Sequence, residues 1–371
     1  MEHLIPDSAF QAMPLFMLIL VAMGSVWVLI RGADWLVDGA AGLAYRVGIP
    51  KVIVGATIVS LGTTSPETAV SVMAAWGGNA GLALGNAVGS IIADTGLIFG
   101  LGCAMVVLPA DKFVLKRQGW VKIGCDFLLA SLCYFAWVFH GDQAQITRPF
   151  GAVLLVMLAV YMFISIKWAK QHVALSPQTD HPLPTCQMAE LKDKPADEHE
   201  VSASRSAWLL VLMLVVGLTI VICSSRFLVG SATVMAARWG VPDVVIAATL
   251  VALGTSLPEL TVGIASIVKG HRELLVGNVI GADILNVLFV IGASAVAKSL
   301  PIIDPTARIP EIFLYLHLPT MLLMTSMFLF FIFTAIRKGS FSRWMGYPLL
   351  ILYVTYVVLQ FVLTAGGPTH A

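Results

Sequence analysis

The chain has 371 residues, of which 58% are hydrophobic and 12% charged, and its formal net charge is +1. This composition excludes an ordinary soluble domain, and the near-neutral charge excludes the basic surface that binds nucleic acid. The sequence also lacks the alternating ten-residue segments of a membrane β-barrel, so we expect an all-α polytopic protein whose partner is the lipid bilayer.

Ten apolar stretches are long enough to cross a bilayer as helices, since one span needs about 20 residues. The first and the sixth run long, which predicts tilted helices. In chain order, the predicted spans are 14–42, 50–76, 81–108, 118–140, 147–168, 207–237, 242–268, 273–298, 312–335 and 344–365.

The charges in the loops predict the orientation of the chain. With ten spans, the loops on one side hold sixteen Lys and Arg, with Lys122 among them, and the loops on the other side hold four. Positive residues favour the cytoplasmic side, so we expect a multi-pass protein of the cell (inner) membrane with both termini outside. The N-terminus has no basic n-region and no convincing cleavage site, so no removable signal peptide is expected.

Residues 170–205 form the one long polar stretch, rich in Pro, Asp, Glu, Lys and Ser. We interpret this stretch as a cytoplasmic linker between two membrane halves, residues 1–169 and 206–371. The five cysteines are scattered without a CxxC pair, which favours small packing residues over a redox or metal centre. No cofactor is therefore expected.

Two segments of the chain repeat one another. GATIVSLGTTSPETAV begins at Gly55 and AATLVALGTSLPELTV begins at Ala247, and in the gapless alignment Glu67 and Glu259 lie 192 residues apart. Five predicted spans separate the copies, and because five is odd, the second copy enters the membrane from the opposite side. The sequence therefore predicts two inverted five-helix repeats whose equivalent glutamates meet near the bilayer midplane.

Each repeat places a proline inside its apolar run. Pro66 and Pro258 have no N–H, and their rings clash with the carbonyl four residues earlier, so spans two and seven are predicted to be broken helices. In lipid the freed carbonyls need another partner, and a cation is one candidate. Both breaks carry hydroxyls and a carboxylate, at Thr63, Thr64 and Glu67 and at Thr255, Ser256 and Glu259. An all-oxygen set of this kind suits hard cations, and its recurrence argues against a simple proline kink.

Spans three and eight, also predicted to be broken, add further polar groups. These are Asn86, Ser90 and Asp94 in the first copy and Asn278, Asp283 and Asn286 in the second. Together with the two glutamates, the two aspartates would cost about 10 kcal/mol or more if they were ionised and unpaired at membrane depth. No Lys or Arg lies in these four spans near the acids, so we expect protons or bound cations to neutralise them.

At these residues the chain resembles the cation/calcium exchanger superfamily, the sodium/calcium antiporters, over both repeats and the ten-span layout. The run GTSLPEL…GNVIGAD is specific for that family. The resemblance implies a central site for one Ca²⁺ or several Na⁺, with spans one and six sliding across the rest to alternate access. It makes Glu67 and Glu259 the principal Ca²⁺ ligands, with backbone carbonyls from Thr63 and Thr255. It also implies Na⁺ or water contacts at Thr64, Ser256, Ser60, Ala252, Ser90, Asp94 and Asn286.

The chain departs from the family pattern at Ala282 and Asp283, which stand where the family has Ser and Asn. Ala282 has no hydroxyl, so one Na⁺ site is in question. Asp283 is a further candidate ligand, and an acid in a helix contact is the alternative interpretation. Asp34 and Asp38 in span one are weaker candidates for residues that line an ion pathway.

These observations predict secondary active antiport of Ca²⁺ against Na⁺, by a monomer and without enzymatic activity. Coupling to H⁺ or K⁺ is the alternative within the same class. A cation channel is a different and less favoured class. A membrane-embedded enzyme would need a nucleophile–base pair or a His/Cys metal site, and the repeated segments offer neither.

Overall fold

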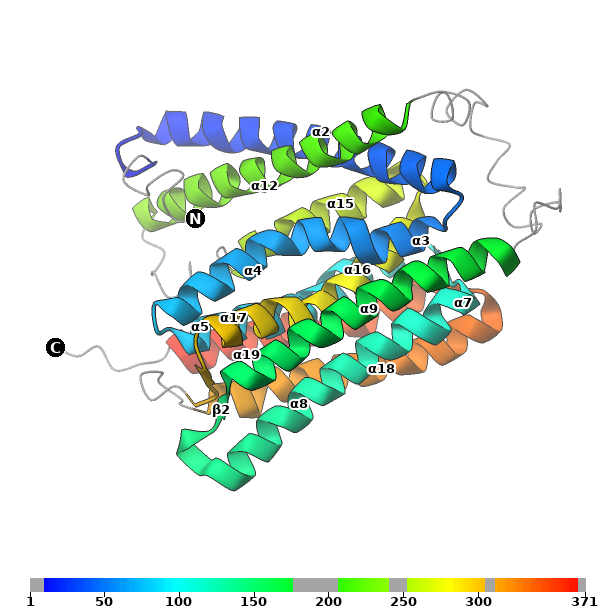
Figure 1. Cartoon of the computed structure of the whole chain (residues 1–371). Helices are drawn as coiled ribbons and strands as arrows, with labels where there is room; N and C mark the ends of the chain where they lie inside the picture. The colour runs from blue at the N-terminus through cyan, green and yellow to red at the C-terminus, as the bar shows by residue number, and fades with distance from the viewer. Residues whose placement is uncertain (1–9, 176–205, 240–251, 304–310, 366–371) are drawn as a thin grey trace.

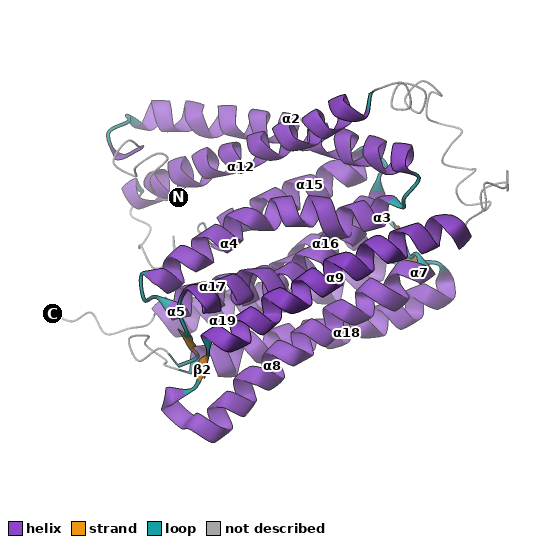
Figure 2. Ribbon diagram, viewed as in Figure 1, coloured by secondary structure: helices purple, strands orange, loops and turns teal. Residues whose placement is uncertain are grey.

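The computed structural model describes residues 10–175, 206–239, 252–303 and 311–365. Almost all of these residues are helical (Figure 2). The first half contains α2 (Leu15–Val47), α3 (Lys51–Val54), η1 (Gly55–Val59), α4 (Ser60–Trp76), α5 (Ala80–Ala93), η2 (Asp94–Phe99), α6 (Gly100–Met105), β1 (Leu108–Pro109), α7 (Lys112–Val114), η3 (Leu115–Gly119), α8 (Trp120–His140), η4 (Gly141–Gln143), β2 (Gln145–Ile146) and α9 (Arg148–Leu175).

The second half has a corresponding series of elements. It contains α12 (Ala207–Arg238), α14 (Ala252–Thr255), α15 (Leu257–Val268), α16 (Arg272–Leu285), η6 (Asn286–Ile291), α17 (Gly292–Ala297), β3 (Leu300–Pro301), η7 (Phe313–His317), α18 (Leu318–Lys338), β4 (Ser340–Phe341), η8 (Arg343–Met345) and α19 (Gly346–Ala365).

Eight helices in the described part of the chain are long and apolar enough to cross a membrane. They coincide with eight of the ten predicted spans, which confirms the all-α polytopic class. The second predicted span is also a continuous helical run, through α3, η1 and α4. The seventh is described only from Ala252 onward, so its first residues, 242–251, lie outside the described part.

Helices α2 and α12 lie side by side along one edge of the molecule, next to α4 and α15 (Figure 1). The α16–η6–α17 span is the most enclosed, because 94% of its most apolar window is buried inside the protein, against 22% for α9. A span surrounded by protein can carry polar side chains without exposing them to lipid. This enclosure is why Asp283 and Asn286 are tolerated there.

Short local signals begin and end these helices. Gly48, with φ 72°, caps the C-terminus of α2 in the left-handed conformation that glycine adopts without strain. The Asn79 side chain accepts a hydrogen bond from the Leu82 N–H and so starts α5. The first of these turns joins α2 to α3, and the second joins α4 to α5.

The offset of 192 residues found in the sequence also relates the elements. It takes α5, η2, α6 and β1 of the first half onto α16, η6, α17 and β3 of the second, residue for residue. The short strands then pair crosswise between halves, with β1 antiparallel to β4 and β2 antiparallel to β3. Each half is therefore tied to the other at two places rather than packed as a separate body.

Glycines allow α16 to approach the α3–η1 segment at backbone distance. A Cβ built on Gly277 would collide with the Val52 carbonyl, and one on Gly281 would collide with Ser60 and with the backbone of Ala56. Small residues permit this kind of contact between helices in membranes. The contact joins the two repeats directly beside Ser60, at the start of α4.

Candidate functional site

The candidate site lies where irregular helix turns from both halves meet. The π-helical segment η1 leads into Ser60, while η2 begins at Asp94 and η6 begins at Asn286. A π-turn inserts an extra residue and redirects the side chains that follow it, and such turns are frequent at functional sites. Spans two, three and eight thus each contain a wider π-helical turn within a continuous helix. In span seven, by contrast, α14 and α15 are separated at Ser256.

The predicted break at Pro66 differs from what the structure shows, because Pro66 lies inside α4 without ending it. Hydroxyls on both sides of the proline donate to backbone carbonyls of the turn before it. Ser65 Oγ donates to the Leu61 carbonyl at 2.6 Å, and Thr68 Oγ1 donates to the Thr64 carbonyl at 3.0 Å. A membrane helix can continue past a proline where neighbouring groups and local adjustments compensate for the lost backbone bond.

Glu67 and Glu259 are 0% and 1% exposed and interact with each other electrostatically. Oε1 of Glu67 accepts hydrogen bonds from Ser90 Oγ at 2.9 Å and from Ser256 Oγ at 3.1 Å. Oε1 of Glu259 accepts one from Thr64 Oγ1 at 3.4 Å. Oε2 of each glutamate is buried and has no hydrogen-bond partner among the described residues. The two helix-borne carboxyl groups therefore converge, and each presents one oxygen that a cation could bind.

Asp94 and Asn286 form a second pair across the repeats. Both are fully buried, and Asn286 Nδ2 donates to Asp94 Oδ2 at 3.5 Å. Their remaining oxygens, both Oδ1, find no hydrogen-bond partner in the described part of the chain. Asp94 also interacts electrostatically with Glu67 and Glu259, so the two pairs belong to one cluster.

The remaining predicted residues surround this cluster. Ser60 and Thr63 are fully buried in the first turn of α4, where Thr63 Oγ1 donates to the Ser60 carbonyl at 3.4 Å. Thr255 is 9% exposed, and its Oγ1 donates to Asn86 Oδ1 at 3.1 Å. Ala252 is the first residue of α14. Eleven of the twelve predicted residues thus lie on α4, α5–η2, α14–α15 and η6, around the glutamates.

Asn86 has a connecting role that the sequence did not reveal. Its Nδ2 donates to Ser71 Oγ at 2.9 Å and to the Glu67 carbonyl at 3.4 Å, while its Oδ1 accepts from Thr255. One side chain on α5 therefore contacts α4 and α14, one from each half. This connection holds the two glutamate-bearing segments in register.

Asp283, the twelfth predicted residue, has a different environment. Its Oδ2 lies 2.8 Å from Nζ of Lys122, which is fully buried on α8. Two expectations are therefore wrong. Lys122 is not a loop residue, and a basic side chain does lie beside one of the four acids. Lys122 supplies Asp283 with a positive partner, which it shares with Asp126 at 2.9 Å.

Asp34 and Asp38 lie away from the glutamates, at the side of α2 that faces the end of α15. Lys269 Nζ lies 2.7 Å from Asp38 Oδ1 and 3.7 Å from Asp34 Oδ1. These side chains are between 24% and 34% exposed. They form an ion-paired contact between α2 and the rest of the bundle rather than part of the buried cluster.

Comparison with known proteins identifies the family. The model of the sodium/calcium exchanger protein family matches residues 16–167 and 209–362. This chain is a member of the sodium/calcium exchanger protein family. Among its relatives, "Putative antiporter CaxA" of Alkalimonas amylolytica is 31% identical over 93% of this chain and 98% of its own. Sodium/calcium exchanger MaX1 of Methanosarcina acetivorans is 26% identical over 92% and 98%.

Solved structures of the sodium-calcium exchanger NCX_Mj have the same fold. One of them superimposes with a TM-score of 0.72 over 93% of this chain and 99% of NCX_Mj, at 24% sequence identity. Membership in the sodium/calcium exchanger family makes the chain a membrane transporter for cations and not an enzyme.

The sequence analysis of this exchanger did not identify several buried polar residues beside the site. Lys122, Asp126 and Thr325 lie on α8 and α18, and Thr95 directly follows the predicted Asp94. Lys122 and Asp126 are four residues apart within an apolar run, a spacing that places opposite charges on one helix face. That spacing was the available signal.

Proposed function

We propose that this exchanger is a secondary active antiporter that exchanges Ca²⁺ for Na⁺ at the Glu67–Glu259 site by alternating access. One observation carries the proposal: each glutamate is hydrogen-bonded by a hydroxyl of the other repeat and keeps one buried oxygen to which no described residue donates a hydrogen bond. Two carboxylates brought together without a basic residue between them create a demand for positive charge. A hard divalent cation with oxygen ligands meets that demand.

The same oxygen atoms can serve either ion in turn. In our proposal Ca²⁺ is bound by both glutamates and by the backbone carbonyls of Thr63 and Thr255, and Na⁺ ions are bound by the neighbouring polar groups. Because both ions need the same carboxylates, binding of one displaces the other, and this competition couples their movements. We assign Asp283 no ion contact in this proposal, because its Oδ2 forms an ion pair with Lys122. The Na⁺ contacts comprise Ser60, Thr64, Ser90, Asp94, Ala252, Ser256 and Asn286.

The packing supports movement of α2 and α12 as one unit. Gly32, Gly39 and Gly217 bring these two helices to backbone contact. Both helices share a cluster of buried apolar side chains with α3, η1, α15 and α16, and this cluster is distinct from the large core of the molecule. Helices joined tightly to each other and packed on the core through a separate surface can slide along that surface, which is a common route to alternating access.

The remaining features of the proposal concern topology. We propose that residues 1–169 and 206–371 are the two exchanger repeats, that 170–205 is the cytoplasmic linker, and that both termini face outward across the cell (inner) membrane. The two repeats of one chain supply all proposed ligands, so a monomer suffices.

The test is Ca²⁺ flux into proteoliposomes that contain the purified protein. With Na⁺ inside and Na⁺-free buffer outside, we expect ⁴⁵Ca²⁺ uptake that stops when the Na⁺ gradient is removed. Uptake that follows an imposed pH or K⁺ gradient instead would identify H⁺ or K⁺ as the coupling ion. Uptake without any counter-ion would identify a channel. Either result would refute Na⁺/Ca²⁺ antiport.

A further inference from the structure

Lys122 is the one fully buried Lys or Arg among the described residues. Its Nζ, near the start of α8, lies 2.8 Å from Asp283 Oδ2 and 2.9 Å from Asp126 Oδ2. It also lies 5.0 Å from the centroid of the Phe328 ring. Two carboxylates and an aromatic face thus surround an ammonium group that the protein buries completely.

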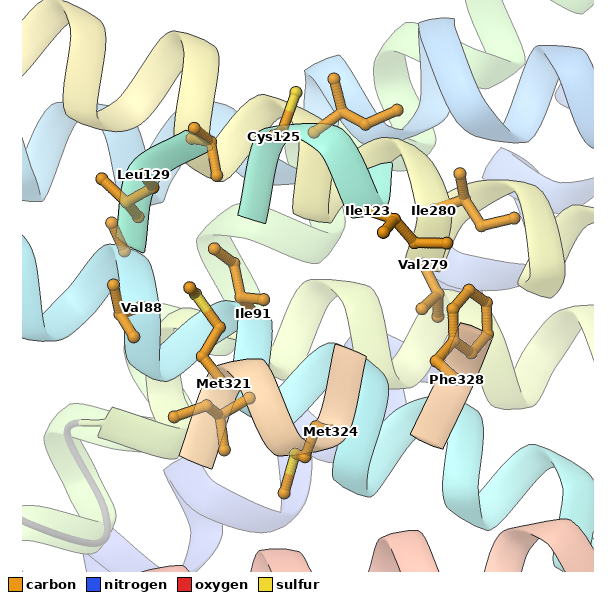
Figure 3. Close-up of a cluster of buried hydrophobic side chains, with 14 of the residues drawn as sticks. Val88, Ile91, Ile123, Cys125, Leu129, Val279, Ile280, Met321, Met324 and Phe328 are labelled. Carbon is orange, nitrogen blue, oxygen red and sulfur yellow. The ribbon is translucent and has the colours of Figure 1, made fainter. Parts of the chain in front are cut away.

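Two hydroxyl groups and an apolar shell complete this environment. Thr95 Oγ1 donates to Asp283 Oδ2, and Thr325 Oγ1 donates to Asp126 Oδ2, both at 2.7 Å. Because these charged groups are fully buried, they act on their neighbours with little screening. Figure 3 shows the apolar side chains of the helices that carry these groups, among them Ile91, Ile123, Val279, Ile280 and Phe328.

The Lys122–Asp283 pair borders the proposed ion site. Thr95 directly follows Asp94 in η2, and Asp283 precedes Asn286 by three residues in the same span. Asp94 interacts electrostatically with both Asp283 and Lys122. The charge on Lys122 therefore reaches the cluster in which we place the cations.

The Lys122–Asp283 pair joins the two halves but has no counterpart under the repeat. The residue that corresponds to Asp283 by the offset of 192 is Ile91, which is buried and apolar. An apolar pair at positions 122 and 283 would pack without the desolvation cost of two buried charges. Packing alone therefore does not explain why this chain has an ammonium here, and its electrostatic effect on the neighbouring acids does.

We infer that Lys122 is a tethered cation whose fixed charge sets the affinity of the exchange site for Ca²⁺. This inference rests on the proposed function. The ammonium makes the surroundings of Asp94 one unit less negative, and Asp283 makes them one unit more negative. Removing either charge alone should shift Ca²⁺ affinity, in opposite directions. When both charges are removed, the two shifts in Ca²⁺ affinity should cancel each other.

The experiment measures the half-saturating Ca²⁺ concentration for Na⁺-driven ⁴⁵Ca²⁺ uptake into proteoliposomes. We expect Lys122→Met to lower that concentration about tenfold and Asp283→Asn to raise it about tenfold. The double variant Lys122→Met/Asp283→Asn should return to within about threefold of the unmodified protein, and Lys122→Arg, which keeps the charge, should do the same.

A merely structural ion pair gives a different pattern. Both single variants would then shift the half-saturating concentration in the same direction, or leave it unchanged while lowering the thermal stability, and either result would overturn the inference. If Lys122→Met does not yield folded protein, Asp283→Asn and the double variant provide the test. A double variant whose half-saturating Ca²⁺ concentration stays as high as that of Asp283→Asn would overturn the inference. Absence of Na⁺-driven uptake by the unmodified protein would instead refute the proposed function itself.

Discussion

Ser256 Oγ lies 3.1 Å from Glu67 Oε1, although 189 residues separate them in the chain. The equivalent pair under the repeat, Thr64 Oγ1 and Glu259 Oε1, is 3.4 Å apart. Each half therefore supplies the hydroxyl that hydrogen-bonds the glutamate of the other half. This reciprocity makes the two carboxyl groups parts of one site rather than the centres of two.

Replacing either glutamate should abolish Ca²⁺ exchange. Glu67→Gln or Glu259→Gln removes one of the two carboxylates proposed to bind Ca²⁺ while preserving side-chain size, so we expect ⁴⁵Ca²⁺ uptake to fall by about 100-fold or more. Ser65→Ala is the matched control, because Ser65 is exposed on the same helix and bonds only its own backbone. Wild-type uptake in either Gln variant would contradict the site assignment.

The hydroxyl pair should affect Na⁺ dependence unequally. Ser256 donates to Glu67 at 3.1 Å and lies 3.3 Å from Ser90 Oγ, whereas the bond from Thr64 is longer. Ser256→Ala should therefore raise the half-saturating Na⁺ concentration about fivefold, and Thr64→Ala should raise it less than about twofold. Measuring Ca²⁺ release against a series of Na⁺ concentrations checks this order, and equal shifts would count against it.

The α2–α12 contact should be intolerant of added volume. A Cβ on Gly217 would lie 2.5 Å from the Leu36 backbone nitrogen and 2.8 Å from the Gly32 carbonyl. We expect Gly217→Val to destabilise the protein by about 1–3 kcal/mol, seen as a lower Tm in detergent. Gly24→Ala is the control on the same pair of helices, because no described atom lies within 4 Å of its Cβ position. An unchanged Tm for Gly217→Val would show that the helices can separate at no cost.

The Asp38–Lys269 contact allows α2 to be locked to the bundle. In a background without other cysteines, Asp38→Cys and Lys269→Cys together should react with a short bis-methanethiosulfonate, since the native side chains meet at 2.7 Å. If α2 and α12 slide during exchange, the cross-link should stop ⁴⁵Ca²⁺ uptake and a reducing agent should restore it. Each single-cysteine variant treated with the same reagent is the control. Undiminished uptake in the cross-linked protein would exclude sliding at this position.

Repetition made much of the fold and of the site predictable from the sequence. Apolar length alone located the spans, and the offset of 192 residues paired Glu67 with Glu259 and Asp94 with Asn286, which the structure brings into one cluster. Polar residues that recur at equivalent positions of two membrane-spanning segments stand out from ordinary hydrophobic sequence.

Features without a repeat counterpart could not be found in this way. Lys122 follows the basic residues Lys116 and Arg117, and this cluster of positive charge predicted that it lies in a loop. Its partner Asp283 is far away in the chain, and only tertiary packing brings them together. The π-turns at Asp94 and Asn286 do correspond under the repeat, but the hydrophobic pattern does not reveal them, since one extra residue in a turn leaves that pattern intact over so short a stretch.

The crosswise hydrogen bonds have a consequence for synthesis. When only the first five spans have left the ribosome, Glu67 can bond Ser90 of its own half, but Ser256 has yet to be translated. The nascent half thus holds an acid whose full set of partners arrives only with α14 and α15. Membrane insertion of the later segments then completes the carboxylate's environment, and a prematurely terminated product would be left with an incomplete polar centre for quality-control proteases to recognise.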